Sequence, residues 1–173
     1  MCVRTTTLRD GRTALIRPLT ENDADLLFCC FHSFSGEARK FFAPHPFSRE
    51  IAEDICSRAP TERTAKRFIV TENAPPDGEA LGYAFLWFLD QDVPLLGICL
   101  TENATGQGLG RDVIEFLMEQ ASRLGHDTIR LTVVARNERA RALYESMGFR
   151  YCGDHTWSEH AAGWSLKMEK DLP

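Results

Sequence analysis

Thr105-Gly106-Gln107-Gly108-Leu109-Gly110 places three glycines at alternate positions, directly after the apolar stretch 93–100 and directly before an amphipathic helix. The first backbone N–H groups of a helix have no partner within it, and the helix dipole adds partial positive charge at that end. Glycine removes the side chains that would keep a ligand away from the backbone. The stretch therefore predicts a strand-to-helix turn that binds an anion such as a phosphate.

Two well-known phosphate-binding motifs do not match this turn. A P-loop needs Gly-Lys-Ser or Gly-Lys-Thr, and neither follows the glycines. The dinucleotide-binding motif G-x-G-x-x-G lacks its third glycine here, because Arg111-Asp112-Val113 follows Gly110. A turn whose glycines serve packing alone remains the alternative at this stage.

The hydrophobic pattern on either side of the turn predicts one domain over residues 1–173. Asp10-Gly11 marks a hairpin near the start of the chain. Short connections join the strands that precede the glycine turn, which is typical of an antiparallel meander. Strands are expected at 5–8, 14–17, 67–72, 80–90, 93–101, 128–134, 149–155 and 164–170, and helices after Thr20, at 48–58, at 108–124 and at 137–147.

The composition is that of a globular domain and excludes several classes of protein. Of 173 residues, 43% are hydrophobic and 26% are charged, and the formal net charge is −5, so no basic field points to nucleic acid. No apolar stretch approaches the roughly 18 residues that span a membrane, and residues 1–5 lack the apolar core of a signal peptide. We therefore expect a cytoplasmic protein that binds neither nucleic acid nor membranes.

The six cysteines invite a disulfide or metal-site interpretation that their spacing does not favour. No pair has the C-x-x-C spacing, and no cysteine–histidine cluster has the spacing of metal ligands. The cysteines are Cys2, Cys29, Cys30, Cys56, Cys99 and Cys152. Free thiols and no bound metal are expected.

A second motif narrows the choice of ligand. The stretch from Asn137 to Phe149 reads N-x-x-A-x-x-L-Y-E-x-x-G-F and lies about thirty residues after the glycine turn. Together the two motifs resemble the GNAT superfamily of N-acyltransferases, and residues 8–23 also look like the start of many such domains. The resemblance implies an α/β fold of the α+β type, with a mixed, mostly antiparallel sheet splayed between 93–101 and 128–134 and flanked by about four helices.

The resemblance also implies an activity, which is transfer of an acetyl group from acetyl-CoA to a primary amine by direct attack on the thioester. The acceptor stays open between a protein lysine, a protein N-terminus and a small amine. A non-catalytic domain that binds or senses acyl-CoA is the alternative. The oligomeric state is also open, with a homodimer as one candidate because the exposed ends of such a sheet often pair.

Particular residues carry the implied roles. Tyr144 is similar to the general acid that returns a proton to the coenzyme A thiolate, although its position on an apolar helix face also suits a core tyrosine. Asn137 is similar to a residue that holds the cofactor, or it is a plain helix N-cap. Arg111, Arg136 and Arg139 flank the phosphate sites. The expected coenzyme A contacts are Ile98, Leu100, Thr105, Gly106, Gln107, Gly108, Leu109, Gly110, Arg111 and Asn137.

Two departures from the family pattern affect these assignments. The first position of the glycine motif is usually Gln or Arg, and here it is Thr105, so one side-chain contact near the pyrophosphate is lost or replaced by a hydroxyl. The stretch 95–99 contains no carboxylate to deprotonate the amine. Glu102 is the candidate general base, against the alternative of a solvated turn, and His45, Asp154 and His155 are more remote options.

Three phenylalanines and two prolines fall close together at Phe41-Phe42-Ala43-Pro44-His45-Pro46-Phe47. The prolines predict a loop rather than a helix. The phenylalanines either cover the core or form a wall that faces the substrate.

Overall fold

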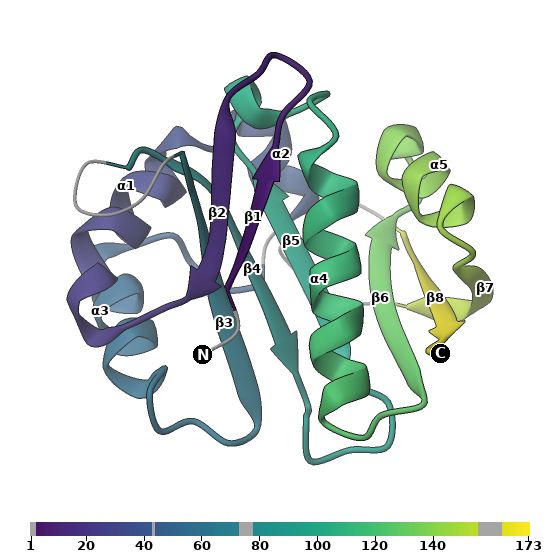
Figure 1. The fold of residues 1–173 in the computed structure, drawn as a ribbon. Coiled ribbons are helices and arrows are strands. Elements are labelled where there is room, and N and C mark those ends of the chain that lie inside the picture. The colour runs from purple at the N-terminus through teal and green to yellow at the C-terminus, as the bar shows by residue number, and fades with distance from the viewer. Residues whose placement is uncertain (1–2, 43, 73–77, 156–163) are drawn as a thin grey trace.

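The structure, a computed structural model, describes residues 3–42, 44–72, 78–155 and 164–173. One eight-stranded sheet runs through these ranges, with helices on both faces (Figure 1). The strands are β1 (Arg4–Thr7), β2 (Thr13–Pro18), β3 (Ala65–Glu72), β4 (Ala80–Trp87), β5 (Leu95–Leu100), β6 (Thr128–Val134), β7 (Arg150–His155) and β8 (Ser165–Asp171). The helices are α1 (Ala24–Ser33), α2 (Gly36–Phe41), α3 (Arg49–Arg58), α4 (Leu109–Arg123) and α5 (Glu138–Ser146), with short 3-10 turns η1 (Glu21–Asp23) and η2 (Glu102–Ala104).

The sheet is mostly antiparallel and is divided at one place. The strand order is β1-β2-β3-β4-β5-β6-β8-β7, and only β5 and β6 run parallel to each other. They meet at one register position, Leu95 opposite Arg130, where the Arg130 amide donates to the Pro94 carbonyl over 2.9 Å. Beyond it the strands separate, so the expected fold class and the splay between these strands are confirmed.

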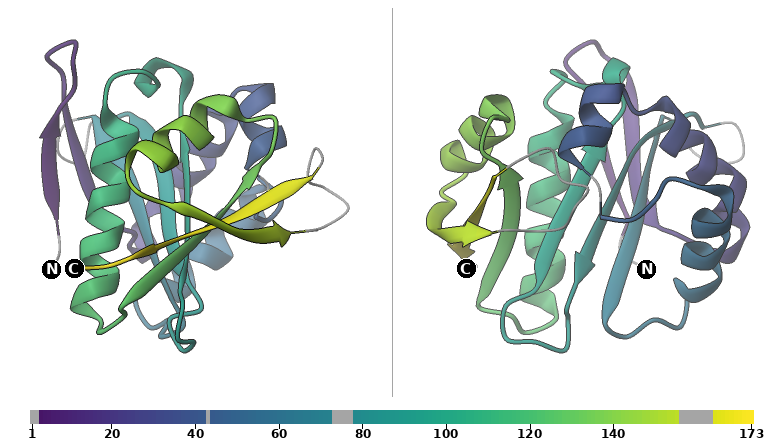
Figure 2. Two further views of the ribbon diagram at one scale, coloured as in Figure 1. Left: turned by 90° about the vertical axis from the view of Figure 1, so that its right-hand side faces the viewer. Right: turned by 180° about the vertical axis from the view of Figure 1, so that it is seen from behind.

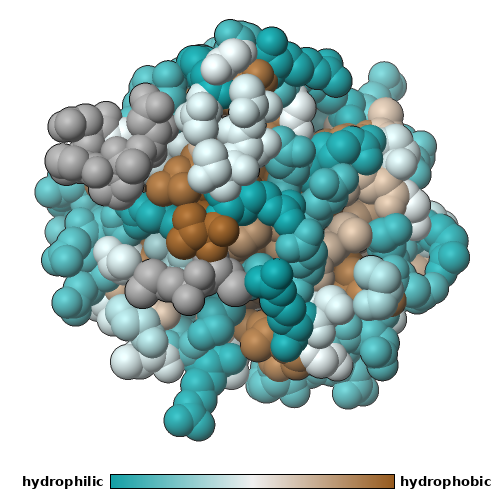
Figure 3. Space-filling model, in the orientation of Figure 1, coloured by the Kyte–Doolittle hydropathy of each residue, from teal (hydrophilic) through white to brown (hydrophobic). Residues whose placement is uncertain are grey.

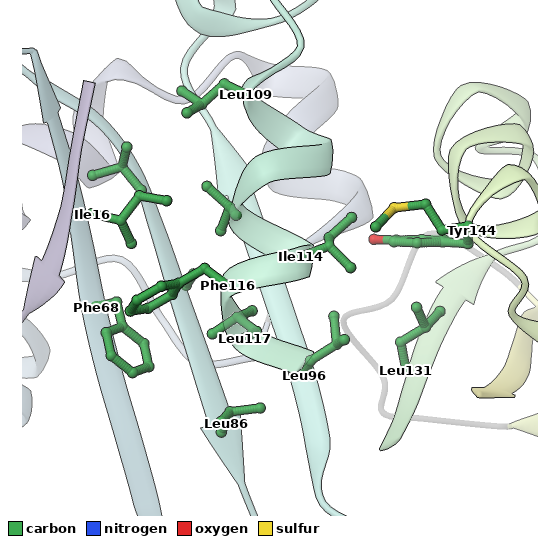
Figure 4. Packing of buried hydrophobic residues seen from close by; sticks show 14 of the residues in the cluster. Ile16, Phe68, Leu86, Leu96, Leu109, Ile114, Phe116, Leu117, Leu131 and Tyr144 are labelled. Carbon is green, nitrogen blue, oxygen red and sulfur yellow. The ribbon is translucent and has the colours of Figure 1, made fainter. Parts of the chain in front are cut away.

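Each face of the sheet carries its own hydrophobic core. Successive side chains of a strand point to opposite faces, and in β4 Leu86 packs on one side while Tyr83 packs on the other. α4 covers the first face, where Phe116 and Leu117 join the core around Phe68 (Figure 4). α1 and α3 cover the second face (Figure 2). The two hydrophobic cores thus pack on both faces of β4 and β5, beside the division of the sheet.

Local signals explain where several elements begin and turn. Gly11 adopts a φ of +89° in the β1–β2 hairpin, as the Asp10-Gly11 signal predicts. The Ser48 hydroxyl accepts a hydrogen bond from the Ile51 amide and caps α3, also as expected. Gly148 takes a φ of +85° directly after α5, the left-handed conformation that ends many helices.

One helix, α2, was not anticipated, and it makes five α-helices where about four were expected. The Ser35 hydroxyl caps it by accepting from the Ala38 amide over 3.1 Å. Arg39 fastens it to the end of α1, because its guanidinium donates to the carbonyls of Phe31 and Phe34 over 2.9 and 3.2 Å. α2 ends at Phe41, so the prolines that follow limit the helix without preventing it.

Two further expectations concern membrane-spanning helices and the state of the cysteines. Within those ranges, no helix combines the length and the apolar character needed to cross a membrane. The five described cysteines are all free thiols, and three of them, Cys30, Cys56 and Cys99, are buried.

Candidate active site

A cavity of about 980 Å³ lies where β5 and β6 separate. Its walls come from β5, the glycine turn, the start of α4, the end of β6, the first two turns of α5 and the short helix α2. On the face shown in Figure 3, hydrophobic residues reach a largely hydrophilic surface on the side of β6 and α5. Ten of the expected site residues line the cavity: Ile98, Leu100, Glu102, Thr105, Gly106, Gly108, Gly110, Arg111, Asn137 and Tyr144.

The glycine turn places backbone beside the cavity and its large apolar side chain in the core. Gly106 and Gly108 adopt φ values of +84° and +90°, which other residues rarely take. Leu109 begins α4 and is fully buried. The Gln107 carbonyl accepts a hydrogen bond from the Arg9 amide. Neither Gln107 nor Leu109 lines the cavity. The unpaired amides at the start of α4 lie beside this turn, an arrangement that favours anion binding over packing alone.

Thr105 uses its hydroxyl inside the turn. The hydroxyl donates to the Thr101 carbonyl over 2.8 Å, and the Thr105 amide donates to the Glu102 carbonyl over 3.1 Å. The Thr101 hydroxyl lies 3.1 Å from the Leu81 carbonyl of β4. These bonds hold the turn against the end of β5, and they occupy the Thr105 hydroxyl.

The upper part of β5 has a backbone edge that no described strand pairs with. Ile98 and Leu100 line the cavity here, beyond the single contact between Leu95 and Arg130. An unpaired strand edge can bind an extended ligand through main-chain hydrogen bonds. The amide-bearing pantetheine arm of coenzyme A has donors and acceptors suited to such an edge.

Gly97 shapes the same stretch of β5. A Cβ atom at this position would lie 2.2 Å from the ring of Phe85 on β4, so only glycine lets that ring rest against the strand. Phe85 in turn stacks on Trp87, with ring centroids 4.0 Å apart and planes inclined by 17°. Gly97 therefore fixes an aromatic surface at one end of the cavity.

Tyr144 packs as a core tyrosine and also lies on the cavity wall, while its role as a general acid remains a prediction. It is only 8% exposed and packs edge-on against Phe149, with ring centroids 5.9 Å apart, yet it also lines the cavity. Its hydroxyl points from α5 toward Ile114 of α4 (Figure 4). Burial raises the pKa of Tyr144 to about 12, with a smaller contribution from the nearby Cys99 thiol. The phenol therefore keeps its proton at neutral pH, as a proton donor must.

Asn137 acts as the N-cap of α5, because its side-chain oxygen accepts from the Ala140 amide over 3.2 Å. It lies on the wall of the cavity at the same time. The structure thus shows the capping role directly, and contact with a cofactor remains a prediction.

Three arginines expected near the phosphates line the cavity, in different surroundings. Arg111 donates to the Ser146 hydroxyl over 2.7 Å and so joins α4 to α5. The Arg136 guanidinium packs over the Phe41 ring at 5.5 Å and connects the β6–α5 turn to α2. Arg139 approaches the glycine turn, with Nη2 3.3 Å from where a Cβ atom of Gly106 would lie. Arg111 follows the turn directly in the sequence, whereas Arg139 reaches the turn from α5.

The candidate general bases are scattered. Glu102 is exposed on η2 and lines the cavity, whereas Asp154 accepts hydrogen bonds from the Tyr151 hydroxyl and the Trp164 indole. Burial lowers the pKa of His45, which lies among aromatic rings and does not line the cavity. The side chain of His155 lies outside the described residues. Glu102 remains the candidate among these four.

The end of the cavity beside α2 is aromatic. Phe41 and Phe42 line it together with Phe85 and Trp87. Phe42 also packs on the second core, so it covers the core as expected, and a role as a wall that faces the substrate remains a prediction. Ala43 lies outside the described residues. A smaller hollow of about 290 Å³ adjoins this end and is lined by Glu37, Lys40, Phe41 and Arg136.

Five charged residues that line the cavity were not named as site residues from the sequence: Arg9, Glu37, Lys40, Asp112 and Glu138. Arg9 and Glu37 are two that no motif indicates. Glu37 belongs to the unanticipated helix α2, and Arg9 lies next to the β1–β2 turn. Both reach the cavity through tertiary packing, since neither is near a motif. The Asp10-Gly11 hairpin signal identified the turn but gave no indication that it packs against residues 103–107. Among the described residues, no group of three His, Cys, Asp or Glu side chains could hold a metal ion.

Comparison with known proteins agrees with this architecture. A sequence model described as the acetyltransferase (GNAT) family matches residues 30–149. The ribosomal protein bS18 alanine N-acetyltransferase of Escherichia coli (strain K12) is 34% identical over 82 residues, which are 47% of this chain and 53% of that protein. The chain thus spans about half the length of the curated relatives it matches.

Two solved structures have the same fold over most of their length. Mycobacterium smegmatis RimJ in complex with CoA-disulfide aligns with a TM-score of 0.80 at 17% identity, covering 98% of this chain and 86% of that one. Spermidine N-acetyltransferase from Vibrio cholerae, in complex with CoA and spermine, aligns with a TM-score of 0.74 at 17% identity, covering 92% and 95%. With the family match over 30–149 and the divided sheet, these findings show that the chain belongs to the GNAT acetyltransferase family.

Proposed function

We propose that this protein transfers an acetyl group from acetyl-CoA to a primary amine. The observation that carries the proposal is a cavity at the divided sheet. It brings together a glycine turn at a helix N-terminus, an unpaired edge of β5 and a buried, protonated Tyr144. These features suit, in order, the pyrophosphate, the pantetheine arm and the departing thiolate of coenzyme A.

The proposed chemistry is direct attack. The amine nitrogen of the acceptor bonds to the thioester carbonyl carbon, and the carbon–sulfur bond then breaks. The Tyr144 hydroxyl gives its proton to the leaving thiolate and is reprotonated from solvent, while the proton released by the nitrogen passes to Glu102 or to water. Holding the two reactants in one cavity supplies most of the acceleration, because it removes the entropic cost of their encounter.

The aromatic end of the cavity bears on the acceptor. Phe41, Phe42, Phe85 and Trp87 offer flat apolar surfaces, and the adjoining hollow adds one carboxylate, on Glu37, and two cations, on Lys40 and Arg136. The other carboxylates that line the cavity, Glu102, Asp112 and Glu138, lie on η2, on α4 and at the start of α5. A polyamine carries several positive charges and needs several carboxylates to offset their desolvation. These walls favour an amine with one positive charge on an apolar body, such as the N-terminus of a peptide with apolar residues.

The test is thiol release from acetyl-CoA, measured with a thiol reagent over a panel of amines. We expect release with peptides that begin with small or apolar residues, and less release with spermidine at equal concentration. Equal or faster turnover of spermidine would overturn the acceptor assignment alone.

A parallel measurement of melting temperature separates binding from catalysis. Acetyl-CoA is expected to raise the melting temperature, since a ligand stabilises the folded state to which it binds. Stabilisation without thiol release from any amine would favour the alternative, a domain that binds or senses acyl-CoA. Absence of stabilisation by any coenzyme A species contradicts both functions.

A further inference from the structure

The β1–β2 hairpin is fastened to the glycine turn. The Arg9 amide donates to the Gln107 carbonyl over 3.1 Å, and Arg12 Nη2 donates to the Asn103 carbonyl over 2.8 Å. Leu8, next to Arg9, is buried in the core under α4. Figure 1 shows the hairpin turn beside the loop that leads into α4. The hairpin therefore forms part of the structure that surrounds the turn.

Strand β1, which leads to Arg9, is also held along its length. The Thr6 hydroxyl donates to the Asp112 carboxylate in the first turn of α4. Arg4 donates to the Asp112 carbonyl over 3.2 Å and pairs with Glu119, which lies further along the same helix. These contacts fix β1 against α4, so the position of Arg9 relative to the start of that helix is set by several independent bonds.

The Arg9 side chain lies at the cavity without a partner among the residues that the structure describes. Its Nε atom is 3.9 Å from where a Cβ atom of Gly108 would lie, and the residue lines the cavity. Arg12 of the same hairpin differs, since it pairs with Asp10 and Glu72, whereas Arg139 approaches the turn from α5 on the side of Gly106. A guanidinium that lies beside unpaired helix amides, with no carboxylate to neutralise it, is suited to a phosphate.

The glycine turn itself lacks one side chain of the family pattern. Thr105 stands where relatives carry Gln or Arg, and its hydroxyl is bonded to the Thr101 carbonyl. We infer that Arg9 binds the pyrophosphate of coenzyme A, supplying from the hairpin the contact that Thr105 does not supply from the turn. This inference rests on the proposed function, because the pyrophosphate belongs to the acyl donor.

The test compares the affinities of coenzyme A and dephospho-CoA, which lacks the 3′-phosphate, by titration calorimetry. Loss of one charge-assisted hydrogen bond should weaken binding about tenfold in Arg9→Ala. We expect the same factor for both ligands, a larger loss in Arg9→Glu, and most of the affinity retained in Arg9→Lys. Arg58→Ala is the matched control, because Arg58 pairs with Asp54 on α3 and does not line the cavity.

Three results would overturn the inference. Arg9→Ala could bind coenzyme A as tightly as the unmodified protein does. Its loss could disappear with dephospho-CoA, which would assign Arg9 to the 3′-phosphate instead. Arg9→Glu could bind no more weakly than Arg9→Ala, which would show that charge at this position is irrelevant. If the unmodified protein binds neither ligand, the proposed function itself fails, so the two failures are distinguishable.

Discussion

At the scale of single residues, Tyr144 combines burial with a position on the wall of the cavity. Burial raises the pKa of Tyr144 to about 12, so the phenol loses its proton only far above neutral pH. A raised pKa makes the phenol a weaker acid, yet it guarantees that the proton is present when the thiolate departs. Position in the cavity and protonation state therefore support the same role.

We predict that Tyr144→Phe lowers kcat at least tenfold while the KM for acetyl-CoA changes little, because the hydroxyl acts on the leaving thiolate. In the unmodified protein, kcat should not fall between pH 7 and 10 through loss of the Tyr144 proton. Steady-state rates across this pH range check both statements. Tyr151→Phe is the control, since Tyr151 is exposed on β7 and does not line the cavity. Equal rates for Tyr144→Phe and the unmodified protein would remove Tyr144 from the mechanism.

Residues also show how far sequence alone could reach. Tyr144 and the glycines lie in local motifs whose spacing is visible in the sequence, and all of them line the cavity. Arg9 reaches the same place because a hairpin docks on a turn far along the chain. No local pattern encodes that contact, and only the buried Leu8 and the bonds of β1 to α4 bring it about.

At the scale of elements, strands were easier to anticipate than the short helix α2. The strand 128–134 is rich in β-branched residues, with Arg130 as its one charged residue, and β6 has these same bounds. α2 has six residues, too few for helical periodicity, and its bonds run from Arg39 to carbonyls of α1. Helices of this length depend on tertiary contacts rather than on propensity, which is why the sequence pattern missed it.

A prediction at this scale concerns the contact between β4 and β5. Gly97→Ala should destabilise the protein by about 1–3 kcal/mol, because the new methyl group would lie 2.2 Å from the Phe85 ring. Gly36→Ala, at the start of α2, is the matched control, since no atom lies within 4 Å of its Cβ position. Urea denaturation of both variants measures the difference. The proposed role of Gly97 is wrong if the two variants have the same free energy of unfolding.

At the scale of the whole molecule, two buried tyrosines on different elements make stability sensitive to alkali. Burial raises the pKa values of Tyr83 and Tyr144 to about 12, against 10.0 in the unfolded chain. A group whose pKa is higher in the folded state contributes its full stabilisation below the unfolded pKa and loses it as the pH rises toward the folded pKa. Both tyrosines therefore lose their contribution to stability between pH 10 and 12.

We predict that the free energy of unfolding begins to fall near pH 9, because burial raises the pKa values of the Cys30, Cys56 and Cys99 thiols above the ordinary value of 9.0. It falls further above pH 10, by as much as roughly 2–3 kcal/mol per tyrosine at pH 12. Denaturant titrations at a series of pH values test this. Tyr144→Phe should show a shallower decline than the unmodified protein, and Tyr151→Phe should not. A decline of the same steepness in all three would mean that other groups control alkaline unfolding.

The division between β5 and β6 has a consequence for solubility. An exposed strand edge with free N–H and C=O groups normally invites pairing with a second molecule and leads toward aggregation, which proteins prevent with edge charges, prolines or bulges. Here the free edge at Ile98 and Leu100 faces inward, across a cavity bounded on its far side by the end of β6. A slender ligand can enter that space, whereas a further strand with its side chains would meet β6 and α5. The fold thus leaves the unpaired backbone groups of β5 available to a ligand while shielding them from pairing with a strand of a second molecule.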